Sequence, residues 1–404
     1  MRFLDPADVV RCASTCRRWG RVVADASAVL SRSSRPLPPL PSFFLGFFHG
    51  DAASDVARRR KRKRHDDPGI GNHGPRFVPI HSGARLLGSP DGISSGDLLP
   101  AAFHGIVGHG FFENSRPVAS HDGRLVLELQ GAGAGLELCL CVCNPMTGHM
   151  VLLPPLPGSG PYICALLTAD DPAFFRLLLV YNRSQGTRTF LRAYSSDTAR
   201  WSPEVRRSPA IKSEKLRKMG QAIMLRGVAY WPLGFTVMGV RLDDDDTPVE
   251  VPMPPPDGIG ETPHKRRLLC VTRDGRLADA AAGMCRDRFS MSISVLEPPR
   301  PSVGDPGRWE TVPPPDIINR GAVVDESMTL RGVAGIHLRW FCQRTGKLLF
   351  TLGQGSTRVG TFALDVDTRD AEELIGGRHC ASWKNFVGYE MDAAAYLASI
   401  VPSH

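Results

Sequence analysis

The sequence predicts a mainly β protein made of repeated antiparallel sheets, with one short helical segment ahead of them. Glycine and proline together make up about 19% of the 404 residues, against an average near 12%, and they follow no collagen-like period. Such an excess is typical of many turns that join many short strands. A strand–turn–strand unit also recurs along the chain, which favours an array of similar sheets over a single sandwich.

Five turns, each between two short β-rich runs, mark the recurring unit. The threonines of the first three turns, Thr147, Thr198 and Thr247, lie 51 and 49 residues apart. A period near 50 residues is that of a kelch-like, four-stranded propeller blade. We therefore expect a kelch-like β-propeller of six or so blades. The turns fall at residues 144–148, 196–200 and 245–247, before Trp309, and at 367–369.

A short β-rich run precedes each turn, and we interpret it as the inner strand of a blade. Each run begins with a glycine or a polar residue, which suits a strand that enters the crowded space around the central axis of a propeller. Residues 76–115 leave room for a sixth unit, and the apolar run at 43–48 could close the last blade, because an open edge would invite aggregation. The expected inner strands are 123–127, 176–180, 227–231, 275–277 and 347–350.

The N-terminal stretch 4–23 predicts an amphipathic helix. Asp5 can cap it, and Pro6 suits the first helical position, where the missing N–H costs nothing. Apolar residues such as Val9 lie on one face with Trp19 beside them, while arginines cover the opposite side. One helix cannot bury such a face within itself. The helix must dock, either onto the rest of this chain or onto a partner.

The same stretch, LDPADVVRCASTCRRWGRVVAD, resembles the second half of an F-box, the helical module that docks onto the Skp subunit of SCF ubiquitin ligases. An F-box normally opens with an LPxELLxxIL-type helix, which supplies much of the Skp contact, and no such helix precedes Met1 here. Two interpretations stay open: the gene model starts too late and omits the opening helix, or the chain has a degenerate F-box that binds Skp weakly or not at all. The resemblance assigns Skp contact to Leu4, Pro6, Val9, Val10, Cys12, Cys16, Trp19 and Val22.

The net charge of +8 is concentrated in one run. Residues 58–64, RRRKRKR, are all basic, so the remainder of the chain is close to neutral and has no generally basic surface for nucleic acid. The polar surroundings predict a loop or linker. The run is either a nuclear localisation signal or a solvated insertion loop. Its members are Arg58, Arg59, Arg60, Lys61, Arg62, Lys63 and Arg64.

These features divide the chain into three parts. A partial F-box spans 1–32, and a proline-rich hinge with the possible strand at 43–48 and the basic insertion spans 33–75. The propeller spans 76–404 and ends in a short helix over 393–400. No apolar segment follows Met1 as in a secretory signal, and none reaches the ~18 residues of a membrane helix. We expect an intracellular protein of the nucleus, the cytoplasm or both, without a membrane partner.

The sequence offers no catalytic or metal-binding constellation. Cys139, Cys141 and Cys143 fall on one face of a strand, and this spacing favours a core-facing strand over a zinc site. The four aspartates at 243–246 suit an exposed hairpin tip. No phosphate-binding loop, HExxH or GxSxG motif occurs. We therefore expect a binding protein, with no enzymatic activity, cofactor or metal.

The F-box-like start, followed by degenerate kelch-like repeats, resembles the large plant F-box family with an associated β-propeller domain. This resemblance implies a substrate adaptor: the helix docks the Skp subunit and cullin ligase core, and the propeller rim holds an unknown protein substrate. The alternative is an interaction scaffold with a degenerate F-box and no ligase link. The segments that carry the resemblance are CNPMTGHMVLLPPLP, AYSSDTARWS, GVAYW, RDGRL and GYEMDAAAYLASI.

Overall fold

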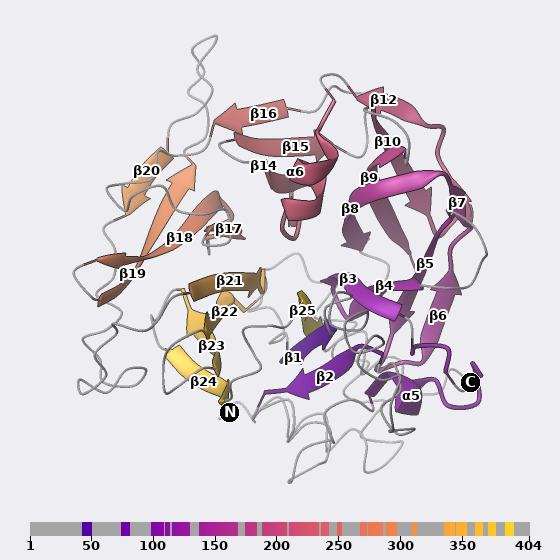
Figure 1. Ribbon diagram of the computed structural model, residues 1–404, viewed down its shortest axis with the longest axis horizontal. Helices are drawn as coiled ribbons and strands as arrows, with labels where there is room; N and C mark the ends of the chain where they lie inside the picture. The colour runs from indigo at the N-terminus through magenta and orange to yellow at the C-terminus, as the bar shows by residue number, and fades with distance from the viewer. Residues whose placement is uncertain are drawn as a thin grey trace, which may run out of the picture.

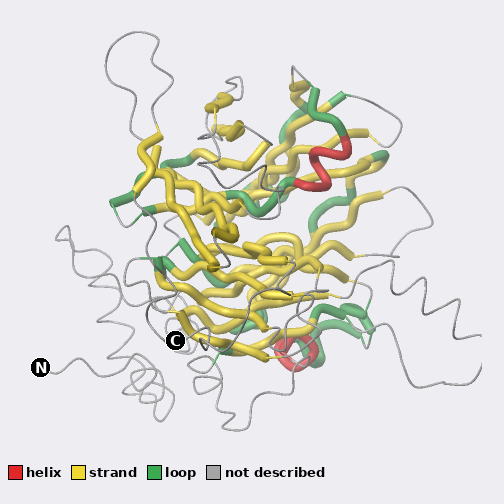
Figure 2. The backbone as a smooth tube through the Cα atoms, turned by 60° about the vertical axis from the view of Figure 1, so that its left-hand side comes forward, coloured by secondary structure: helices red, strands yellow, loops and turns green. Residues whose placement is uncertain are grey.

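The structure is a computed structural model that describes twenty segments of the chain. Within them the protein is mainly β, as predicted, with only two short helices, α5 (Leu98–Ala102) and α6 (Ser213–Lys218) (Figure 2). The described segments are 43–50, 74–80, 98–108, 110–113, 115–129, 137–168, 174–183, 188–207, 210–233, 236–241, 249–252, 267–272, 274–285, 288–296, 309–312, 335–343, 345–353, 360–366, 371–376 and 384–391.

The described strands form six antiparallel sheets, and in five of them the first four strands pair in chain order. Sheet I comprises β3 (Ser115–His121), β4 (Arg124–Leu129), β5 (Glu137–Asn144), β6 (His149–Leu152) and β7 (Leu156–Pro157). Sheet II comprises β8 (Ser159–Thr168), β9 (Phe175–Arg183), β10 (Thr189–Ser195), β11 (Arg200–Trp201) and β12 (Val205–Arg207). In sheets I and II a fifth short strand pairs with the third, β7 with β5 and β12 with β10. Sheet III comprises β13 (Ile223–Leu225), β14 (Val228–Leu233), β15 (Thr236–Arg241) and β16 (Val249–Pro252).

The remaining sheets complete the set. Sheet IV comprises β17 (Arg267–Val271), β18 (Leu277–Cys285), β19 (Arg288–Leu296) and β20 (Trp309–Val312). Sheet V comprises β21 (Gly335–Phe341), β22 (Lys347–Gly353), β23 (Gly360–Asp365) and β24 (Ala371–Gly376). The closing sheet joins the two ends of the described chain and comprises β25 (Lys384–Met391), β1 (Phe43–Gly50) and β2 (Arg76–Pro79).

The sheets lie around a common centre (Figure 1), with β3, β8, β17, β21 and β25 on the side of their sheets nearest to it. These strands and β13, the first strand of sheet III, are called the first strands below. Contacts between these first strands run in a cycle, from β3 to β8, β13, β17, β21, β25 and back to β3. Apolar side chains fill the spaces between neighbouring sheets. Leu127 lies between the closing sheet and sheet I, Leu177 between sheets I and II, and Trp231 between sheets II and III. The core is therefore a series of layers between sheets.

The closing sheet confirms the expectation that the apolar run at 43–48 pairs with the end of the repeat array. β1 pairs antiparallel with β25 on one side and with β2 on the other. Its side chains Phe47 and Phe48 are fully buried, which is the hydrophobic gain that favours this pairing. A sixth sheet is present, but only its strand β2 lies within 76–115, because its other strands are β1 and β25. Among the described residues, the next sheet begins at Ser115.

The inner strands inferred from the sequence are wrong, and the error is the same in all five units. The runs that begin at 123, 176, 227 and 347 lie mainly in β4, β9, β14 and β22, and the run 275–277 leads into β18. Each of these is the second strand of its sheet. A second strand has neighbours on both edges and packs against adjacent sheets, so it forms an apolar run that resembles an inner strand. The glycine before it serves a hairpin turn, where Asp122 and Gly123 have φ of 46° and 75°, as a type I′ turn requires.

The turns on which the repeat was recognised do lie at equivalent places. Residues 144–148 join β5 to β6 and residues 196–200 join β10 to β11, the third and fourth strands of sheets I and II. Cys141 and Cys143 of β5 are buried in the core, as the strand interpretation predicted, while Cys139 is partly exposed. In the described residues, no helix is long and apolar enough to span a membrane.

Several predictions fall on parts of the chain outside the described residues. These are the helix at 4–23 with its Skp-contact residues, the basic run 58–64, the aspartates at 243–246 and the helix at 393–400. They stay predictions.

Candidate functional site: a polar cluster at one end of the ring

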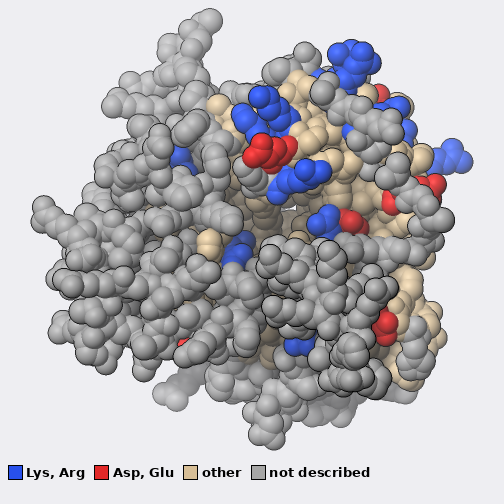
Figure 3. Space-filling model, viewed as in Figure 1, with Lys and Arg blue, Asp and Glu red and all other residues tan. Residues whose placement is uncertain are grey.

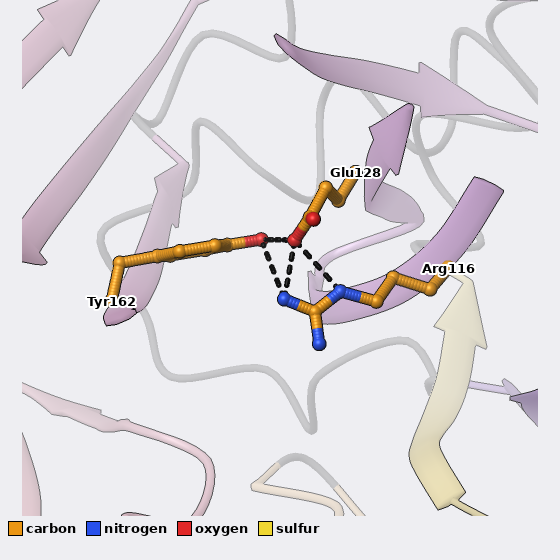
Figure 4. A network of polar contacts seen from close by, with 3 residues as sticks. All are labelled: Arg116, Glu128 and Tyr162. Carbon is orange, nitrogen blue, oxygen red and sulfur yellow. Dashed lines mark hydrogen bonds and ion pairs between the residues drawn. The ribbon is translucent and has the colours of Figure 1, made fainter. Parts of the chain in front are cut away.

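A cluster of three polar side chains lies between sheets I and II, at the end where the first strands begin. Arg116 is the second residue of β3, and Glu128 lies directly opposite it on β4. Tyr162 comes from the first half of β8 in the next sheet. Because opposed residues of an antiparallel pair project to the same face, Arg116 and Glu128 both reach Tyr162 across the space between the sheets. Figure 4 shows the three side chains converging.

One carboxylate oxygen holds the cluster together. Arg116 Nε donates to Glu128 Oε2 at 2.7 Å, and Arg116 Nη2 and the Tyr162 hydroxyl donate to the same oxygen. Arg116 Nη2 also lies 3.5 Å from the Tyr162 oxygen, and the guanidinium carbon lies 5.7 Å from the centre of the Tyr162 ring. The arginine charge is thus shared between an ion pair and an aromatic face.

The cluster favours fixed protonation states. Burial, reinforced by the Glu128 charge, raises the pKa of Tyr162 well above its usual value, so the phenol stays a donor. Burial opposes the charge of Arg116, but Tyr162 and Glu128 outweigh that effect and raise its pKa. Burial also raises the pKa of the neighbouring Cys164 to about 12, against the effect of Arg116, so this thiol is protonated at neutral pH.

The arrangement suits recognition of a partner. The Arg116 side chain is 36% exposed, while Glu128 is 17% exposed. In Figure 4 the third guanidinium nitrogen of Arg116 points away from Glu128, where it can donate to an acceptor outside the cluster. Within the described chain, no group of three or more metal-ligating residues lies together.

The opposite end of the ring carries a different kind of contact. The Gln343 side chain, just after β21 of sheet V, accepts from Met224 N at 3.1 Å and donates to Met224 O at 2.6 Å. Met224 belongs to β13 of sheet III, so the amide links two sheets that are not neighbours in the cycle. This pair of hydrogen bonds links β13 and β21 near their C-terminal ends. Arg116 is near the N-terminal end of β3, so it lies at the opposite end of the ring.

A spacing of twelve residues in the sequence could have indicated this cluster, but the motifs considered above do not include it. In three sheets an arginine of the first strand bonds a residue twelve positions later on the second strand: Arg116–Glu128, Arg267–Asp279 and Arg339–Thr351. The spacing follows from the hairpin between the two strands. The Arg267 side chain is only 9% exposed and Asp279 only 2%, so that pair is structural. Of the two arginine–carboxylate pairs, the one in sheet I is accessible.

Comparison with known proteins adds one match at the N-terminus. Residues 1–29 match the F-box-like family. This match contains all eight residues to which the sequence assigns Skp contact. No curated protein matches the chain.

Solved structures give only distant likenesses. A β-propeller domain of the Trilobed protease from Pyrococcus furiosus is 11% identical, with 78% of this chain and 83% of that chain covered and a TM-score of 0.36. A post-proline cleaving enzyme from Rickettsia typhi is 9% identical, with 91% and 57% covered and a TM-score of 0.38. A prolyl endopeptidase is 10% identical with a TM-score of 0.32, and this chain spans 34% of its length. Likenesses this weak establish neither a shared fold nor a shared activity.

Proposed function

We propose that this protein is the substrate-recognition adaptor of an SCF-type ubiquitin ligase. The segment 1–29 would dock the Skp subunit and so the cullin core, and the ring of sheets would hold a protein substrate. The F-box-like match at 1–29 is the observation that carries this proposal. F-box modules suggest an adaptor role in ubiquitin ligases generally, in which catalysis belongs to the partners. Tethering a substrate raises the effective concentration of its lysines near the charged enzyme.

We further propose that the six sheets are the blades of a kelch-like β-propeller of the plant F-box type, with a partial F-box ahead of it. Two observations support this architecture. The first strands contact one another in a cycle, and β1 and β25 join the two ends of the described chain in one sheet. A ring of sheets that presents loops at its ends suits the recognition of one protein among many, because loops on a folded scaffold commonly carry binding residues. The end that exposes Arg116 is the face we assign to the substrate.

The experiment that tests the adaptor role is a pull-down of purified Skp subunit with the full chain. Trp19→Ala should weaken Skp retention by about 30-fold, because a buried aromatic anchor contributes on the order of 2 kcal/mol to an interface. Arg21→Ala, on the polar side of the expected helix, is the matched control and should retain wild-type binding. The thermal unfolding of both variants should match that of the wild type, because the proposal has this segment contact Skp and not the sheets.

Each other outcome argues against part of the proposal. Loss of ring stability in Trp19→Ala would mean that the helix packs onto this chain and not onto Skp. Failure of the wild type to retain Skp would favour the alternative function, a protein-interaction scaffold with a degenerate F-box and no link to a ligase.

A further inference from the structure

Basic side chains gather at the end of sheet II where β8 begins. β9 finishes at this end, β10 begins there, and β12 runs back toward it beside β10. The chain then crosses the end of the sheet to reach α6, which contacts the innermost strand β8. The exposed cations on this path form what we call the basic strip: Arg183, Arg188, Arg206, Lys212, Lys215 and Arg217.

The strip sits on a fixed support. Asn182 Nδ2 donates to the Ile211 carbonyl at 2.9 Å and lies 2.9 Å from Ser213 Oγ, the first residue of α6. Leu216 of α6 is 1% exposed and packs into the core between sheets II and III. Because the polar and apolar contacts both anchor the helix to sheet II, the lysine and arginine side chains on its outer face are held at one place on the ring.

The local charge is unusual for this chain. Residues 206–218 include six basic residues and one acidic residue, Glu214, whereas the chain outside this segment and outside the run 58–64 is net negative. Among the described residues, Arg183 is the one member of the strip with an ion pair, to Glu204 at 2.7 Å. Figure 3, in the view of Figure 1, shows lysine and arginine side chains spread over α6 and sheet II. A concentrated field of one sign attracts a partner of the opposite sign.

We propose that the basic strip binds an extended, acidic segment of the protein substrate, an inference that rests on the adaptor function proposed above. The strip runs across the sheet end from β12 to α6, so it matches an elongated ligand with carboxylates along its length. Among the described residues, the exposed large apolar side chains include one aromatic, Phe174. It lies just before β9, at the end of sheet II opposite to the strip. The strip thus lacks the stacking platform of a single-stranded nucleic-acid site.

A binding measurement with the full chain tests this proposal. The probe is a fluorescein-labelled peptide of alternating Glu and Gly, followed by fluorescence anisotropy at low and high salt. The double variant Lys215→Glu/Arg217→Glu should bind the probe about tenfold more weakly, because two favourable charge pairs become unfavourable. Binding by the wild type should weaken as salt screens the charges.

A matched variant distinguishes the effect of losing strip cations from the effect of changing the net charge. Arg200 begins β11 and Arg226 lies in the turn between β13 and β14, both at the opposite end of the ring. Arg200→Glu/Arg226→Glu changes the net charge by the same amount and should leave probe affinity within about twofold. Equal losses in the two double variants would overturn the proposal, because they would show a response to net charge alone.

Other probes and the Skp assay complete the test. Tighter binding of oligothymidylate, or of vesicles rich in phosphatidylserine, than of the Glu–Gly peptide would overturn the proposal, and so would equal binding of a Lys–Gly peptide. Both double variants should retain Skp as the wild type does, and Trp19→Ala should still bind the acidic probe. If the wild type retains Skp but does not bind the acidic probe, the strip alone is refuted; if it binds the probe but does not retain Skp, the adaptor role alone is refuted.

Discussion

Replacing Gly388 by alanine should destabilise the ring at the sheet that joins its ends. Gly388 lies in β25, and a Cβ atom built there would be 2.1 Å from Trp340 Cε3, 2.3 Å from Cδ2 and 2.4 Å from Cζ3. Ordinary carbon contacts are near 3.5 to 4.0 Å, so the indole would have to move by more than about 1 Å. Trp340 is 1% exposed and stacks on Phe44 with ring centres 5.6 Å apart, so little space is open to it.

The expected cost of Gly388→Ala follows from this geometry. Inserting a methyl group into a packed core costs typically 1–3 kcal/mol, and a clash with a rigid, buried ring belongs at the upper end, about 3 kcal/mol. The same strand is held by Ser120 Oγ, which donates to the Gly388 carbonyl, and by Tyr389 Oη, which donates to the Gly123 carbonyl at 2.9 Å. Displacement of β25 would therefore strain its contacts with sheet I as well.

Thermal and urea unfolding, followed by circular dichroism and tryptophan fluorescence, measure this effect. Gly388→Ala should lower the Tm by roughly 5 °C or more. Gly50→Ala, in the neighbouring strand β1, is the control, because the nearest atom to its Cβ is Asn385 Nδ2 at 3.9 Å; it should change stability by less than about 0.5 kcal/mol. If both variants unfold together with the wild type, the packing of Trp340 against β25 is wrong.

Two further predictions concern charge. Burial opposes ionisation of Glu204, but hydrogen bonds from Arg183 and Tyr181 outweigh it and lower its pKa below the usual 4.5. Its stabilising contribution is therefore present above about pH 4.5 and lost as the pH falls through the lowered pKa, so Glu204→Gln should lower the Tm by about 1 to 2 °C at neutral pH, with the gap closing in acid; a gap that persists in acid would contradict this. Replacing residues 58–64 by glycine and serine should shift a fluorescent fusion from nucleus to cytoplasm; an unchanged distribution would identify the run as a solvated loop.

The sequence predicted the mainly β class and the repeating unit because turns require particular residue types at neighbouring positions. Asn144 begins the turn after β5, and its side-chain oxygen accepts from the backbone N–H of Met146, so the residue type is dictated by three or four neighbours in sequence. The assignment of strands within each sheet failed for a non-local reason. Apolar content indicates that a strand is buried, but nothing in the run 124–129 indicates whether it is the first or the second strand of its sheet.

The polar cluster could be predicted only in part. The Arg116–Glu128 pair is local, since both residues lie on one hairpin and twelve positions separate them. Tyr162 belongs to the next sheet, and its approach depends on how sheets I and II pack. A single sequence does not encode that packing in any short pattern, because contacts between sheets form across long stretches of chain. The basic strip, likewise, joins cations from four separate places along sheet II.

The pairing of β1 with β25 imposes a delay on the folding of the nascent chain. β1, with its four phenylalanines, leaves the ribosome more than 300 residues before β25, its partner. At about 5–20 residues per second, the strand waits roughly 20 to 60 seconds for the segment that covers it. During that interval an apolar edge is open to chaperones and to neighbouring chains, so the ring closes only after β25 has been synthesised.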